Sequence, residues 1–109
     1  MSMENQNETN LRTKFIEFSE YKSKENDTNG ISLKQLDLWL EQARILDMNR
    51  ITTTDTGILF LKFGTRRMDF QQFLLFLRKL AAQSGDNLTD IFEKLAKCEK
   101  PTLPAWELN

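Results

Sequence analysis

The apolar and polar positions along this chain form a short pattern at 31–36 (ISLKQL) that is repeated at 68–73 (MDFQQF). In each copy an apolar residue precedes a short polar residue that can cap a helix, and a glutamine follows three residues after the cap. A polar loop with a glycine comes before each copy, and apolar residues at helical spacing come after it. The repeat therefore predicts two helix–loop–helix hairpins, joined by a short extended contact between Ile31 and Met68, as in a pair of EF hands.

Five amphipathic segments predict five helices. Apolar residues recur at helical spacing in 11–21, after Ser32, after Thr52, after Asp69 and in 88–96. The unbroken apolar run after Thr52 is also typical of a buried strand, but the cap before it and the glycine after it favour a helix. We therefore expect an all-α fold, in which four helices form two EF-hand-like hairpins and a fifth helix follows them.

The two ends of the chain are predicted to lie outside the helical domain. Residues 1–9 are polar and have no apolar periodicity, which predicts a disordered segment. Prolines at positions 101 and 104 stop the fifth helix, which predicts a tail over 100–109. No linker divides the chain between these ends, so one helical domain is expected over 10–99.

The two predicted loops carry the wrong residues for calcium. An EF-hand loop places oxygen ligands at its first, third, fifth, ninth and twelfth positions and ends in a bidentate glutamate. With the repeated apolar residue at the eighth position, the loops span 24–35 and 61–72, begin with lysine and leucine, and both end in glutamine. We expect no metal site in the second loop. Weak cation binding by the first loop through Glu25, Asp27 and Asn29 is an alternative.

Composition narrows the functional class. The chain has 109 residues, one cysteine, no histidine and a formal net charge of −1. Because it lacks histidine, a Gly-rich phosphate loop and a close pair of carboxylates, neither an enzyme nor a cofactor is expected. A single cysteine allows no internal disulfide and favours a reducing, cytoplasmic setting. No apolar run is long enough for a bilayer and the basic excess is too small for nucleic acid, so neither partner is expected.

Positive charge is concentrated in the middle of the chain. Residues 31–85 carry a net charge of +3, and the segments on either side carry −2 each. Charge runs usually form a solvated surface, and basic residues near a helix end also suit its dipole. The functional interpretation is a patch that binds an acidic protein surface. Its candidate residues are Lys62, Arg66, Arg67, Arg78 and Lys79.

Several linked segments carry a family resemblance. The segment 51–62 reads ITTTD and continues as Ile-x-Phe-x-Lys, the segment 67–73 contains Phe70 and Phe73, and Leu-Ala follows at 80–81. In this order they resemble the core domain of the tubulin polymerisation-promoting protein family. The likeness extends over most of the chain. It implies a degenerate EF-hand-like domain that binds tubulin or microtubules and promotes microtubule assembly or bundling.

Two non-enzymatic functions follow from these observations. The leading one is a cytoplasmic, cytoskeletal module that binds tubulin through its basic residues, with weak self-association as a further partner interaction. The alternative is an adaptor that captures an amphipathic helix of another protein in an apolar groove, without calcium and without tubulin. Salt distinguishes the two, because ions screen contacts between exposed charges and leave apolar contacts largely intact.

Overall fold

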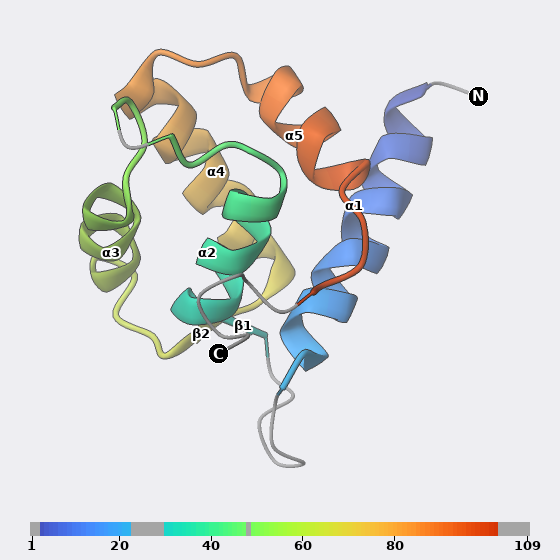
Figure 1. Ribbon diagram of the computed structural model, residues 1–109, viewed down its shortest axis with the longest axis horizontal. Helices are drawn as coiled ribbons and strands as arrows, with labels where there is room; N and C mark the ends of the chain where they lie inside the picture. The colour runs from blue at the N-terminus through green and yellow to red at the C-terminus, as the bar shows by residue number, and fades with distance from the viewer. Residues whose placement is uncertain (1–2, 23–29, 48, 103–109) are drawn as a thin grey trace.

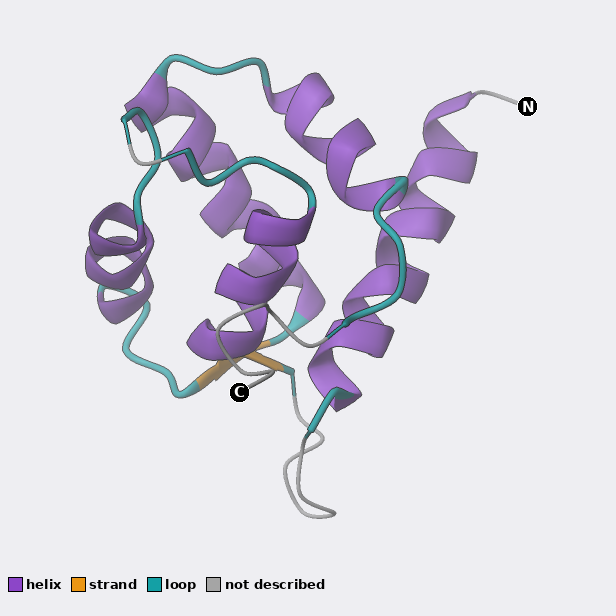
Figure 2. Ribbon diagram, in the orientation of Figure 1, coloured by secondary structure: helices purple, strands orange, loops and turns teal. Residues whose placement is uncertain are grey.

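The computed structural model describes residues 3–22, 30–47 and 49–102. This part of the chain forms five helices and one two-stranded sheet (Figure 1, Figure 2). The elements are α1 (Met3–Glu20), β1 (Ile31–Ser32), α2 (Leu33–Gln42), α3 (Thr53–Leu61), β2 (Arg67–Met68), α4 (Phe70–Ser84) and α5 (Leu88–Ala96). The prediction of an all-α fold with a small β contact is confirmed.

The two short strands join the first hairpin, α1 and α2, to the second hairpin, α3 and α4. They pair antiparallel, with Ile31 opposite Met68 and Ser32 opposite Arg67, as the repeat predicted. Gly30 permits this close approach, because its φ is +119° and a Cβ there would lie 2.1 Å from the carbonyl oxygen of Met68. The side chains of Ile31 and Met68 are fully buried, so apolar packing holds the contact in place.

Capping boxes begin the three middle helices, as the sequence predicted. The pairs are Ser32 with Gln35 for α2, Thr52 with Asp55 for α3, and Asp69 with Gln72 for α4. In each pair the cap side chain accepts a hydrogen bond from the backbone of the third helical residue, whose own side chain accepts one from the backbone of the cap. These starts are therefore fixed by contacts within a few residues of sequence.

The core is organised around Trp39, which is fully buried. Its ring stacks between Phe18 and Phe73, with 5.0 Å between ring centroids on both sides. Its indole Nε1 donates a hydrogen bond of 3.2 Å to the carbonyl oxygen of Leu95. One side chain of α2 thus contacts α1, α4 and α5, and the two hairpins and the fifth helix share one core.

The first helix begins earlier than the sequence predicted. α1 starts at Met3, whereas the sequence predicted a helix from residue 11, and residues 1–2 lie outside the described part. The packed part of the helix starts at Leu11 and includes Phe15 and Phe18. The polar residues before it extend a helix that already exists, which costs far less free energy than starting a new one.

The chain after α5 is attached to the end of α2 through Gln42. The Nε2 of Gln42 donates a hydrogen bond of 3.2 Å to the carbonyl oxygen of Lys100, and its Oε1 accepts one of 2.8 Å from the backbone of Thr102. The first residues of the predicted tail are therefore attached to the domain. The rest of that tail, 103–109, lies outside the described residues.

Candidate functional site

The five basic residues predicted to bind a partner all belong to the second hairpin. Lys62 follows α3, Arg66 precedes β2 and Arg67 lies in it. Arg78 and Lys79 lie within α4, because that helix continues past them for more than a turn. At a rise of about 1.5 Å per residue, Arg78 is about 12 Å along α4 from the start of that helix. The five residues are therefore spread along the hairpin and do not gather at its loop.

Arg67 is used inside the fold. Its Nε donates a hydrogen bond of 2.8 Å to the carbonyl oxygen of Gly30. One terminal nitrogen donates to the carbonyl oxygen of Ser19 at 3.0 Å and to Oε1 of Gln35 at 2.9 Å. Gln35 is buried, and its Nε2 donates to the carbonyl oxygens of Ser19 and Tyr21 at 3.0 and 2.8 Å. The guanidinium of Arg67 thus ties the second hairpin to both helices of the first.

Arg67 also bonds to two oxygen atoms that an EF-hand loop would offer to calcium. In the EF-hand frame, Gly30 is the seventh position, which offers a carbonyl oxygen to calcium, and Gln35 is the twelfth. Both oxygens accept hydrogen bonds from Arg67, so a cation of the chain itself occupies two of the oxygens that calcium would need. The acidic candidates of the first loop lie within 23–29, outside the described residues. Among the described residues, no three His, Cys, Asp or Glu side chains lie close enough together to hold a metal ion.

The other four predicted basic residues are exposed, and none forms an ion pair within the described part of the chain. Elsewhere Lys14, Arg50 and Lys97 are paired with carboxylates. The two carboxylates of the second hairpin are both used as caps: Asp55 accepts a hydrogen bond of 3.0 Å from the backbone of Thr52, and Asp69 caps α4. The exposed positive charge of this hairpin is therefore not neutralised by ion pairs within the described residues.

Exposed apolar side chains accompany this charge. The large apolar residues that are exposed among the described residues are Ile58 (54%), Leu61 (78%) and Leu75 (44%) on the second hairpin and Ile16 (50%) on α1. The first three were not predicted as site residues. The unbroken apolar run in α3 could have indicated Ile58 and Leu61. A helix that buries only one face needs apolar residues on that face alone, so a run around the whole helix leaves some of them exposed.

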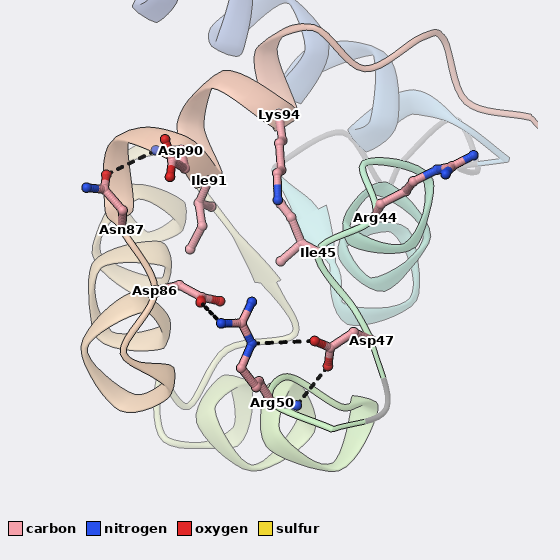
Figure 3. Close-up of a pocket in the computed structure, with 9 residues that line it drawn as sticks. All are labelled: Arg44, Ile45, Asp47, Arg50, Asp86, Asn87, Asp90, Ile91 and Lys94. Carbon is pink, nitrogen blue, oxygen red and sulfur yellow. Dashed lines mark hydrogen bonds and ion pairs between the residues drawn. The ribbon is translucent and has the colours of Figure 1, made fainter.

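A polar pocket of about 220 Å³ lies between the α2–α3 connection and the start of α5 (Figure 3). Arg50 forms ion pairs there with Asp86 at 2.9 Å and with Asp47 at 3.6 Å. Backbone N–H groups of Asn49, Ile51 and Arg50 also bond to Asp47 and lower its pKa to about 2. These charges tie two connections of the fold together, and we assign them a structural role.

Asp37 is a second titratable group with a structural contact. Its carboxylate accepts a hydrogen bond of 2.7 Å from the hydroxyl of Thr56, a fully buried residue of α3. Burial raises the pKa of Asp37 to about 6; the Thr56 hydrogen bond opposes this shift, and the nearby charge of Glu41 adds to it. Asp37 therefore links the packing of α2 against α3 to pH.

Fold and contacts together define an EF-hand-like helical domain in which an arginine of the second hairpin bonds to Gly30 and Gln35 of the first. The chain belongs to the p25-alpha family, whose model matches residues 12–107. This is the core domain of the tubulin polymerisation-promoting proteins, so the resemblance seen in the sequence is confirmed. No curated protein and no solved structure gives a significant match to the chain. In the described residues, no helix has the length and apolar character needed to cross a membrane.

Proposed function

We propose that this protein is a non-enzymatic module that binds tubulin or microtubules in the cytoplasm and thereby promotes microtubule assembly or bundling. Membership of the p25-alpha family supports this class of partner. The observation that carries the proposal is the set of exposed basic residues on the second hairpin without ion pairs, which suits the acidic surface of tubulin. The set consists of Lys62, Arg66, Arg78 and Lys79.

Arg67 is left out of this set because its guanidinium bonds to three carbonyl groups of the domain. Replacing it would disturb the fold and binding together. Bundling needs two attachment points for each bundling unit. We therefore infer that the domain by itself binds along microtubules, and that self-association supplies the second attachment point.

Co-sedimentation of the full chain with preformed microtubules tests the proposal. We expect saturable binding that weakens strongly between low and physiological salt, because ions screen exposed charges within about 8 Å. Lys62→Glu with Arg66→Glu should abolish binding at physiological salt. Lys97→Glu with Lys100→Glu is the matched control, because it makes the same change of charge outside the hairpin.

The outcomes are distinct. Absence of binding by the wild-type chain at low salt would refute the tubulin function. Undiminished binding by Lys62→Glu with Arg66→Glu would refute the electrostatic contact alone.

The adaptor function remains the second candidate, and the exposed apolar residues Ile58, Leu61 and Leu75 favour it. An amphipathic helix of another protein would cover them, as helices do in other apolar docking sites. Binding of such a helix would persist at high salt and would need no microtubules. A chain that does not co-sediment with microtubules but binds such a peptide in high salt would favour the adaptor.

A further inference from the structure

We propose that the second hairpin binds its partner through the exposed apolar and basic side chains of α3, α4 and the loop between them, and that the occupant is an acidic amphipathic helix at the surface of tubulin. This inference rests on the function proposed above and names the contact that would carry it. We call this surface the α3–α4 surface. Its apolar residues are Ile58, Leu61 and Leu75, and its basic residues are Lys62, Arg66, Arg78 and Lys79.

Helical spacing places charge beside Ile58 and beside Leu75. On α3, Lys62 follows Ile58 by four residues, and on α4 Arg78 and Lys79 follow Leu75 by three and four residues. Residues at these spacings are neighbours on one side of a helix. Each helix therefore presents an apolar side chain next to an exposed cation.

The packing of α3 against α4 brings the two helices together. The ring of Phe76 lies 6.3 Å from the ring of Phe60 and 6.2 Å from that of Phe63, measured between centroids. Leu61 and Leu75 are chain neighbours of these buried or half-buried rings, yet both are exposed. Leu61 and Leu75 therefore lie outside the packed core of the hairpin, where another molecule can reach them.

The charge of the surface selects the occupant. Residues 51–85 contain five basic and two acidic residues, and both acidic residues cap helices. An apolar partner without acidic residues would leave the exposed cations unmatched, and a purely acidic one would leave Leu61 in water. A helix with an apolar stripe flanked by Asp and Glu satisfies both parts of the surface.

Apolar substitutions with a matched control test this inference. Leu61→Ser removes the most exposed apolar side chain of the surface, and Ile16→Ser makes a similar change at the exposed apolar residue of α1. We expect Leu61→Ser to weaken microtubule binding about tenfold, as for an interface anchor, and Ile16→Ser to leave it unchanged. Circular dichroism and thermal unfolding of both variants would verify that each remains folded.

Salt separates the two parts of the surface. In Leu61→Ser the residual binding should depend on salt as in the wild-type chain, whereas reversal of Lys62 and Arg66 should remove most of that dependence. Equal binding by Leu61→Ser and the wild-type chain would overturn the inference while the tubulin function stands. A wild-type chain that does not bind would overturn both. Sedimentation velocity without tubulin tests a second copy as occupant: a wild-type dimer that dissociates in Leu61→Ser would also overturn the inference.

Discussion

The two hairpins begin their second helices with the same motif, but they differ in how they use cations. In the first hairpin, loop oxygens of Gly30 and Gln35 accept hydrogen bonds from Arg67, which the second hairpin supplies. In the second hairpin, the exposed cations beside the loop, Lys62 and Arg66, form no ion pair within the described residues. The comparison indicates that an EF-hand-like pair can be held together by an internal arginine. One hairpin is then left with a surface suited to binding.

The largest expected effect comes from breaking the joint between the hairpins. Gly30→Ala should lower the free energy of unfolding by about 3 kcal/mol, because the new Cβ would collide with a backbone oxygen at a φ that side chains rarely adopt. Gly64→Ala is the control in the second loop, since it has a positive φ but open space around it, and about 1 kcal/mol is expected. Urea unfolding monitored by tryptophan fluorescence measures both. Equal losses would show that the close contact of β1 and β2 is unimportant.

A smaller loss is expected when the internal cation is removed. Arg67→Gln should lower the free energy of unfolding by about 2 kcal/mol, because buried carbonyl groups lose charged hydrogen-bond donors. Arg66→Gln, one residue away and exposed, should change it by less than about 0.5 kcal/mol. Calcium should not restore the loss, because the first loop begins with lysine and ends with glutamine. Thermal unfolding with calcium and with a chelator measures this, and rescue by calcium would contradict the prediction.

The smallest effect concerns pH and the packing between the hairpins. The pKa of Asp37 is raised to about 6 from its ordinary value of 3.8, so between these values the folded state binds a proton that the unfolded state has released. The contribution of Asp37 to stability therefore falls as pH rises from about 4 to about 6. Asp37→Asn keeps a side-chain oxygen for Thr56 and should raise the unfolding temperature relative to the wild-type chain at pH 7 but not at pH 4. A difference that does not depend on pH would contradict this assignment.

Much of the fold was predictable because its signals are local. The capping boxes at Ser32, Thr52 and Asp69 formed as predicted, and so did the pairing of Ile31 with Met68. The early start of α1 was not predictable, since it contains only polar residues between Met3 and Leu11, and these turns extend a helix that is packed from Leu11 onward.

The candidate site was predicted only in part. The sequence identified the basic residues of the second hairpin, but composition cannot show which apolar residues of a helix remain outside the core. Ile58 and Leu59 are adjacent apolar residues of α3, yet Ile58 is exposed and Leu59 is buried. Packing of α3 against α2 and α4 determines which of the two side chains is buried.

The sequence by itself determined where the helices begin, the layout of two hairpins and the loss of calcium ligands, because capping, periodicity and ligand type depend on a few neighbouring residues. Only the tertiary structure decided which of two adjacent arginines bonds inside the fold and which stays exposed. Arg66 and Arg67 are the same residue type, so the sequence cannot distinguish them. Arg66 lies in a bend before β2, whereas Arg67 lies in the strand itself. Pairing of β2 with β1 directs Arg67 toward Gln35 and the end of α1, and leaves Arg66 exposed on the surface.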